Sequence, residues 1–307
     1  MVVNRAWRRV APFGVQFVDD QTGRFVADGL VVTGWPTGEP SRRVVARLNR
    51  SAVFVLHDVP GIRDLEMGAG DDAYWSTVPR RPFVIDVDDL TRRFLPFRFT
   101  VELPLRGLLQ LTCGSPPSVP GPGSTTVRGV PLFTAPTRPA VPGSAVVRAD
   151  LWDAVANAPA AWAVVQASIP SAVARGVPPV RALADDRGQV ALHLPCPDQE
   201  DLDGGPFESP SGPGPVPLTA RTWSVDLAAA YGPLSSDPRA ATSSHGAPIP
   251  DLCAAVMQPP ATLWSDRSQT MPLTRASLTY GRETILRSIG SGAGPQSVLL
   301  LTPGSPP

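Results

Sequence analysis

Three histidines, His57, His193 and His245, are the side chains of this chain best suited to acid–base or metal chemistry. No two of them stand at the spacing of metal ligands, and none lies near a cysteine within a coordinating motif. His57 precedes Asp58, as a hydrolytic dyad would require, but no serine occupies the context of a nucleophile elbow. The sequence therefore favours a turn at His57–Asp58 and the outward face of a strand for His193.

Two acidic runs, Asp86–Asp89 and Asp198–Gly204, offer oxygen ligands of the kind that Ca²⁺ takes. The second run includes a glycine, yet it lacks the residue-by-residue spacing and the terminal glutamate of an EF-hand loop. The run Gly290–Gly294 lacks the lysine of a phosphate-binding loop, and no helix is predicted after it. We interpret the first acidic run as the end of a half-buried strand over residues 82–88, the second as a solvated loop and the glycine run as a hairpin tip.

Tryptophans at six positions could line a carbohydrate groove or anchor a core: Trp35, Trp75, Trp152, Trp162, Trp223 and Trp264. At one or two per sheet, such side chains are more often core anchors. The sequence thus predicts no catalytic, cofactor-binding or metal-binding residues, no cofactor and no small-molecule substrate. We expect a protein that is not an enzyme.

The composition and charge argue against several classes of protein, among them helical, nucleic-acid-binding and membrane-spanning proteins. Of 307 residues, 38 are proline, which disfavours helices and fits short strands joined by ordered loops. The 27 basic residues are all arginine and are balanced by 27 acidic ones, so no long-range field favours nucleic acid. No segment has the apolar length of a membrane span, and Met1–Val10 is not followed by the apolar stretch of a secretory signal.

Cysteine usage predicts a reducing environment. Cys113, Cys196 and Cys253 are widely separated and odd in number. This pattern is not a disulfide framework, and a cytoplasmic location is the default expectation.

The elements that position these residues read as strands. Asp19–Gly23 and Asp185–Gly188 are acidic-glycine turns, each between two strand-like runs. Residues 97–103 alternate cleanly, so Phe97, Phe99, Val101 and Leu103 should face a core while Arg98, Thr100 and Glu102 face outward. Residues 251–257 predict one short helix with Asp251 as its N-cap. The tail, including 276–287 and 297–301, predicts a final pair of strands.

We predict an all-β fold of two β-sandwich domains joined by a Pro/Gly-rich linker, with at most one or two short helices. The N-terminal sandwich should span 1–112, the linker 113–143 and the C-terminal sandwich 144–307, with a long loop at 198–217. Loops of such length are usually functional or disordered.

Both turn regions, Asp19–Val26 and Ala184–Leu192, resemble the turn-strand signature of carboxypeptidase-regulatory-like and transthyretin-like sandwich domains. Further segments resemble a structural protein of phage-tail-like contractile injection systems: Thr22–Arg24 with Asp28–Leu30, Val59–Asp64, Pro82–Asp88 with Arg93–Pro96, and Gln258–Trp264 with Leu278–Glu283 and Leu286–Ser288. The resemblance implies a non-enzymatic tail or baseplate component whose partners are other protein subunits of a large assembly. Such a protein would be cytoplasmic in the assembled particle and released on lysis.

A second hypothesis, from a different class, is a free-standing β-sandwich module that binds carbohydrate or protein. An assembly component should co-purify with a large sedimenting particle, whereas a free-standing module should not.

Overall fold

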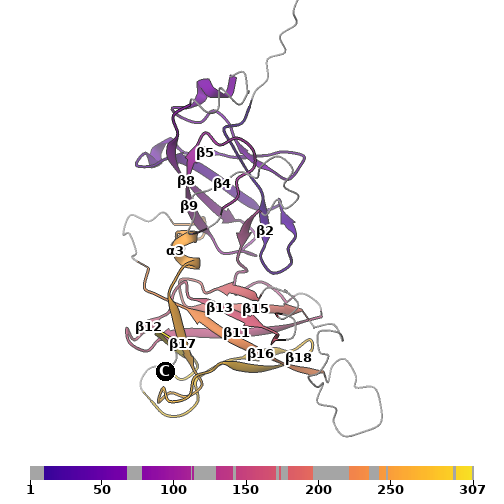
Figure 1. Ribbon diagram of the computed structural model, residues 1–307, viewed down its shortest axis with the longest axis vertical. Helices are drawn as coiled ribbons and strands as arrows, with labels where there is room; N and C mark the ends of the chain where they lie inside the picture. The colour runs from indigo at the N-terminus through magenta and orange to yellow at the C-terminus, as the bar shows by residue number, and fades with distance from the viewer. Residues whose placement is uncertain are drawn as a thin grey trace, which may run out of the picture. The chain divides into compact units, whose positions relative to one another are not determined.

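The computed structural model describes residues 10–67, 78–111, 113, 129–140, 143–170, 173, 179–195, 221–234, 242–246, 248–292 and 295–305 (Figure 1). Within these ranges the chain is built mainly of strands, which confirms the predicted all-β, sandwich-like fold. The helical elements are short: the 3₁₀ turns η1 (Pro40–Arg42) and η2 (Arg63–Met67), and the helix α3 (Leu252–Val256). No helix in the described ranges has the length and apolar content to cross a bilayer.

The contacts divide the chain into two units that are not simple halves. Unit 1 comprises Met1–Thr91, Pro96–Leu132 and Ala241–Cys253, and unit 2 comprises Arg92–Leu95, Phe133–Ala240 and Ala254–Pro307. The sequence predicted one break, between 112 and 144. It contained no signal that residues 241–253 return to the first unit.

Unit 1 holds three small sheets. Their strand orders are β1-β7-β6, β10-β2-β3 and β5-β4-β8-β9. The bounds of these strands are β1 (Phe13–Val15), β2 (Phe17–Asp19), β3 (Phe25–Val26), β4 (Leu30–Pro36), β5 (Val44–Val45), β6 (Arg47–Leu48), β7 (Phe54–Leu56), β8 (Arg81–Asp89), β9 (Phe97–Leu103) and β10 (Val130–Leu132).

The side chains of β9 alternate between buried and more exposed positions, as predicted, and the buried ones contribute to the core of unit 1. Phe97, Phe99, Val101 and Leu103 are buried, whereas Thr100 and Glu102 are exposed and Arg98 is half-buried. Successive side chains of a strand point to opposite faces, so one face of β9 supplies apolar surface and the other stays polar.

Part of the predicted linker 113–143 is a strand. Residues Val130–Leu132 form β10, which pairs in parallel with β2. Residues 114–128 of that linker, and the loop 198–217, lie outside the described residues. The prediction missed β10 because proline and glycine surround it, although Val130 and Leu132 are fully buried.

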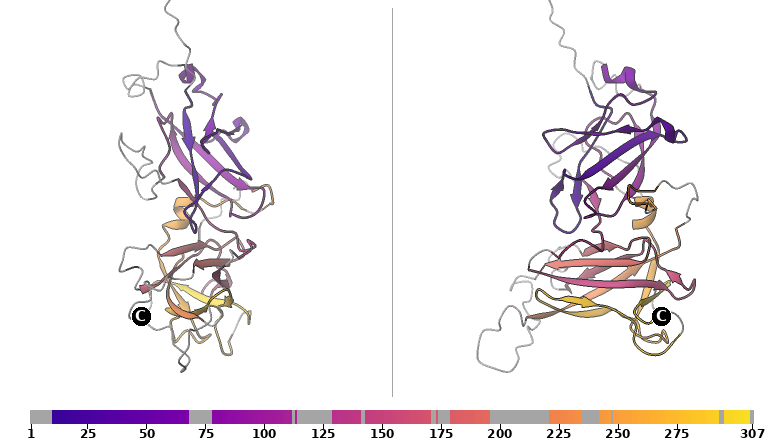
Figure 2. Two further views of the ribbon diagram at one scale, coloured as in Figure 1. Left: turned by 90° about the vertical axis from the view of Figure 1, so that its right-hand side faces the viewer. Right: turned by 180° about the vertical axis from the view of Figure 1, so that it is seen from behind.

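The described strands of unit 2 form one sheet of ten. Figure 2 shows the ribbon from two further sides. The bounds of its strands are β11 (Ser144–Asp153), β12 (Ala158–Pro159), β13 (Val164–Ser168), β14 (Val180–Leu183), β15 (Gln189–Pro195), β16 (Thr222–Ala230), β17 (Pro260–Trp264), β18 (Arg275–Thr279), β19 (Glu283–Ile285) and β20 (Leu299–Pro303).

Two long strands of unit 2 change partners along their length. The first part of β11 pairs with β15 and β19, and its last residues pair with β20 and β12. Likewise β16 pairs with β18 over Thr222–Asp226 and with β17 at Ala229 and Ala230. Because β11 and β16 each pair with different strands along their length, all ten strands belong to one sheet, and this sheet supplies the residues of the core cluster.

The two acidic-glycine turns lie one in each unit, as predicted, but only the first closes a paired hairpin. Gly23 donates its N–H to Asp19 O at 2.9 Å, and β2 pairs with β3. In the second turn Gly188 donates its N–H to Asp185 O at 3.1 Å. There β14 pairs with β13, while β15 pairs with β11.

The predicted pairing of the last two strands is wrong. β19 and β20 both run parallel to β11, and β20 also pairs antiparallel with β17. Two strands that run parallel to a common neighbour need a longer return than a tight hairpin gives. The region around Gly290 is therefore part of this return and not a hairpin tip.

Candidate functional site

The histidines do not gather into a reactive site. The Nδ1 atom of His57 lies 3.3 Å from Oε2 of Glu66, and Oε1 of Glu66 accepts the N–H of Val59 at 3.3 Å. Asp58, the partner considered from sequence, instead accepts Arg63 Nε at its backbone carbonyl, at 3.1 Å. The His57–Glu66 contact thus joins η2 to the turn after β7, which agrees with the predicted turn role.

The prediction for His193 is wrong. Its side chain is buried, and so is that of Ala191 on the same face of β15. Both faces of β15 are covered along Val190–Leu194, so alternation along this strand carries no information on exposure. His245 lies in a turn that Gly246 N–H closes onto Ser243 O at 3.0 Å.

The carboxylates of the run Asp86–Asp89 are each engaged by protein groups. Asp86 binds Arg98, Asp88 accepts the N–H of Ser244 at 2.7 Å, and Asp89 accepts both the N–H and the hydroxyl of Thr91. No group of three or more metal-ligating side chains occurs among the described residues. The second run, Asp198–Gly204, lies outside them.

Asp86 belongs to a polar cluster built on an aromatic ring. Its Oδ1 lies 3.1 Å from Nε of Arg98, and its Oδ2 lies 3.8 Å from a guanidinium nitrogen of Arg43. The guanidinium carbon of Arg43 stands 4.2 Å from the centre of the Trp35 ring, and that of Arg98 stands 5.9 Å from it. Burial raises the pKa of Asp86 above its ordinary value, although Arg98 and Arg43 act to lower it.

Tryptophan burial bears on the carbohydrate alternative. Trp35, Trp162, Trp223 and Trp264 are buried, as predicted for core anchors. Trp152 is half-buried and donates its indole N–H to Asn157 Oδ1 at 3.2 Å, and Trp75 lies outside the described residues. Sugar rings stack on exposed aromatic faces, which the four buried tryptophans do not offer.

A shallow pocket of about 170 Å³ lies where β16 and β17 separate. Its walls come from apolar and small residues, including Leu227, Ala229, Ala261 and Pro272. Pockets for drug-sized molecules usually have about 300–1,000 Å³. This pocket is smaller than that range.

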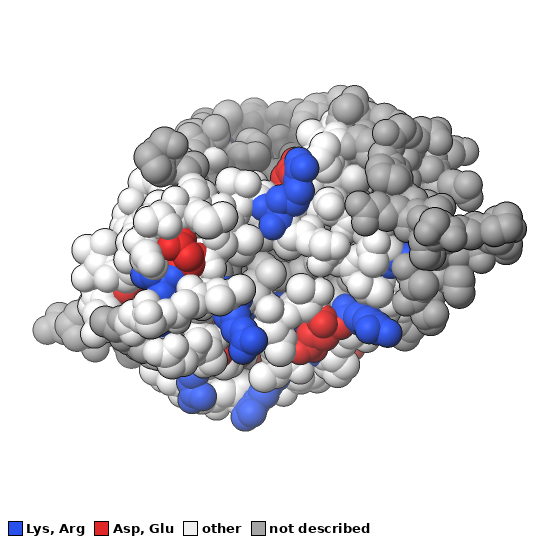
Figure 3. Space-filling model, turned by 90° about the horizontal axis from the view of Figure 1, so that it is seen from below, with Lys and Arg blue, Asp and Glu red and all other residues white. Residues whose placement is uncertain are grey.

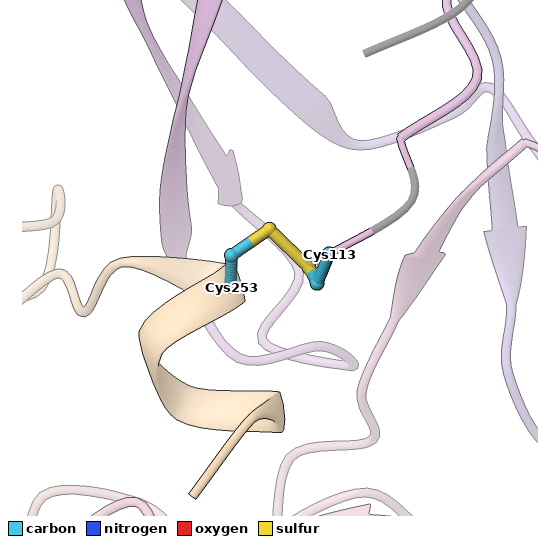
Figure 4. Close-up of a disulfide and its surroundings, with 2 residues drawn as sticks. All are labelled: Cys113 and Cys253. Atoms are coloured by element: carbon cyan, nitrogen blue, oxygen red, sulfur yellow. A yellow bond between two sulfur atoms is a disulfide. The ribbon is translucent and has the colours of Figure 1, made fainter. Parts of the chain in front are cut away.

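The feature that sequence reasoning missed altogether is a disulfide. Cys113 and Cys253 are bonded across 140 residues of sequence, and the bridge joins the first turn of α3 to the segment after β9 (Figure 4). The expectation of no disulfide is therefore wrong. A pair so far apart leaves no mark in spacing, and only the return of residues 241–253 to unit 1 brings the two sulfurs together.

Two residues of unit 2 with exposed apolar side chains are hydrogen-bonded through their backbones to the same residue, Ser265, which follows β17. Met271 O accepts the N–H of Ser265 at 2.9 Å, and Ile289 donates its N–H to Ser265 O at 2.8 Å. Their exposed fractions are 63% and 73%. We call Met271 and Ile289 the apolar pair.

Asp266 holds the loop that carries Met271. Its carboxylate accepts the N–H of Met271 at 2.7 Å and both the N–H and the hydroxyl of Thr270. Although desolvation acts to raise it, these hydrogen bonds hold the pKa of Asp266 below its ordinary value. The loop is thus fixed by side-chain bonds, so Met271 is exposed on an ordered backbone.

The face in Figure 3 carries single arginines and arginines beside acidic residues, separated by uncharged surface. Such a surface has no extended field of one sign, in keeping with a formal net charge of +0.

No family model, curated protein or solved structure matches this chain.

Proposed function

We propose that this protein is a non-enzymatic structural component of a phage-tail-like contractile injection particle, acting in the tail or baseplate. Its partners would be other protein subunits of the particle. It would assemble in the cytoplasm and leave the cell with the particle on lysis. The resemblance of its turn and strand-edge segments supports this family of assemblies.

The observation that carries the proposal is the apolar pair, Met271 and Ile289. A lone exposed aliphatic side chain needs no explanation, but these two flank the same residue, Ser265, on hydrogen-bonded backbone. Contiguous exposed apolar surface marks places where proteins bind one another. A subunit of an assembly needs such contacts with its neighbours.

The polar side chains described above support the same proposal. His57, Asp86, Asp88 and Asp266 each bond to groups of the protein itself, in turns, between strands or across segments. Groups used in this way stabilise a scaffold.

Co-sedimentation tests the proposal. A tagged copy expressed in the native host should sediment with the particle, and Met271→Asp with Ile289→Asp should reduce its incorporation at least about tenfold, since two buried charges in a contact cost several kcal/mol. Val155→Asp is the matched control, because Val155 is an exposed aliphatic residue in another turn of unit 2. The control should incorporate normally.

The thermal midpoint separates a contact defect from misfolding. Surface substitutions usually change stability by no more than about 0.5 kcal/mol, so both variants should melt like the native protein. Equal incorporation of all three proteins would refute a role for the apolar pair. A native protein that never sediments with particles would instead favour the free-standing binding module.

A further inference from the structure

Residues 242–253 form a return segment that is fastened to unit 1 in several ways. Ser244 donates its N–H to Oδ2 of Asp88 at 2.7 Å, and Arg98 of β9 donates its N–H to Pro250 O at 2.9 Å. Arg98 and Asp251 form a single parallel bridge. Ile249 and Leu252 are buried, and Cys253 carries the disulfide to Cys113.

The backbone pairing between the return segment and β9 is short. The return segment meets β9 at one bridge, whereas β9 meets β8 over seven register positions, from Arg81↔Leu103 to Val87↔Phe97. A segment that is paired with a sheet edge at one bridge opens at a lower free energy than a strand that is held by a continuous ladder. The disulfide is the one covalent link among these fastenings.

We infer that the return segment is a redox-controlled strap, locked onto β9 when Cys113 and Cys253 are bonded and released locally when they are reduced. Release frees the N–H of Arg98 at the edge of β9 and the carboxylate of Asp88, while β8 and β9 stay paired. This inference does not depend on the proposed assembly role.

The chemistry is ordinary thiol–disulfide exchange. A dithiol reductant transfers two electrons and two protons to the Sγ–Sγ bond, giving two thiols and leaving the reductant as a cyclic disulfide. Glutathione disulfide reverses the step: the bond between Cys113 and Cys253 forms and two molecules of glutathione are released. Disulfides persist in oxidising surroundings and are reduced in reducing ones, so the strap would be locked in the first and released in the second.

Amide hydrogen exchange tests the strap in a Cys196→Ser background, in which Cys113 and Cys253 are the only cysteines. The oxidised, denatured protein should take up no iodoacetamide and the reduced protein two equivalents. After reduction with dithiothreitol, the amides of Ser244 and Arg98 should exchange at least about tenfold faster. The amides of Ile85 and Phe99, opposite each other in the β8–β9 ladder, should change by less than about twofold.

A second variant keeps the test decisive. Cys113→Ser with Cys253→Ser should show fast exchange at Ser244 and Arg98 with or without dithiothreitol. Two equivalents of iodoacetamide on the oxidised protein, or no change in exchange on reduction, would overturn the inference. Loss of protection at Ile85 and Phe99 together with Arg98, or a double variant that does not fold, would show that the bridge holds the whole unit and would equally overturn it.

Discussion

The core of unit 1 is rich in phenylalanine, whereas alanine is the commonest residue in the core cluster of unit 2. Phe17 lies within ring contact of both Phe54, at 5.5 Å between centroids, and Phe97, at 6.4 Å, and Phe97 in turn meets Phe99 at 6.3 Å. In unit 2 the cluster is made of alanine, valine and leucine with Trp223 and Tyr231. Large rings fill the space between three small sheets, while small side chains suit one sheet of ten strands.

This difference in core composition determines which substitutions should most lower the free energy of unfolding in each unit. In unit 1 a few aromatic rings pack among sheets of three or four strands, and one disulfide fastens the return segment. In unit 2 the ladders of β11 and β16 join many strands, and each alanine buries little surface. We therefore expect single truncations to cost more in unit 1, and backbone changes in the shared turn to cost more in unit 2.

Truncation of a ring in unit 1 should have the largest effect. Phe99→Ala should lower the free energy of unfolding by about 3–5 kcal/mol, because it removes a fully buried ring and leaves a cavity. Val225→Ala in unit 2 removes only two methyl groups, with an expected cost of about 2 kcal/mol. Urea titrations measure both, with the exposed Thr100→Ala as the control. Equal costs for Phe99→Ala and Val225→Ala would show that single truncations do not cost more in unit 1 than in unit 2.

The two acidic-glycine turns offer a matched pair for the backbone. Gly188 has φ +79°, and a Cβ there would lie 2.4 Å from Leu151 O, so Gly188→Ala should cost about 3 kcal/mol through strain and displaced backbone. Gly23 has φ +67° with no atom within 4 Å of such a Cβ, so Gly23→Ala should cost only about 1 kcal/mol. Thermal unfolding of the two variants compares them directly. A larger cost at Gly23 would contradict the packing difference.

The Asp86 cluster tests whether polar groups also stabilise unit 1. Arg98→Ala removes a charge-assisted bond to a buried carboxylate and should cost about 2 kcal/mol at pH 7. Because the native pKa of Asp86 is raised, its contribution to stability is greatest below its ordinary pKa and is lost as pH rises through the native pKa. Loss of Arg98 raises that pKa further. The substitution should therefore lower the free energy of unfolding less at pH 3 than at pH 7.

The control for this variant is Arg42→Ala. Arg42 pairs with Glu39 at 2.6 Å, but both side chains are about half exposed, and exposed pairs contribute roughly 0–1 kcal/mol. Unfolding curves at both pH values give the comparison. A cost of Arg98→Ala that does not change with pH would show that Asp86 does not titrate in this range.

Local patterns predicted the elements that one strand or one turn specifies. The alternation of Phe97–Leu103, the turns at Asp19 and Asp185 and the helix after Asp251 all follow from short-range chemistry. The burial of His193 does not follow from short-range chemistry, because it depends on what covers the second face of β15.

Long-range connectivity could not be predicted in the same way. The parallel pairing of β19 and β20 with β11, and the disulfide across 140 residues, depend on chain segments that meet only in the fold. The apolar pair was equally hidden, because Met271 and Ile289 are eighteen positions apart and look like core residues in a one-dimensional pattern.

We expect the smallest effect at the buried contact between Tyr231 and Asp153 in unit 2, which is the counterpart of the Asp86 cluster in unit 1. Burial, helped by the charge and hydrogen bond of Asp153, raises the pKa of Tyr231 from 10.0 to about 12. The unfolded chain therefore loses this proton first, and stability should fall as pH rises from about 10 to about 12. Unit 1 thus carries a group that titrates on the acid side, and unit 2 one that titrates on the alkaline side.

Tyr231→Phe should cost only about 1 kcal/mol at pH 7, because Asp153 still accepts the N–H groups of Val155, at 2.8 Å, and Ala156, at 3.0 Å. The variant should also lose stability less steeply than the native protein between pH 10 and pH 12, since phenylalanine has no proton to release. Urea midpoints at three alkaline pH values measure the slope. Parallel slopes for the two proteins would mean that Tyr231 titrates alike in the folded and unfolded chain, and that the alkaline response originates elsewhere in the molecule.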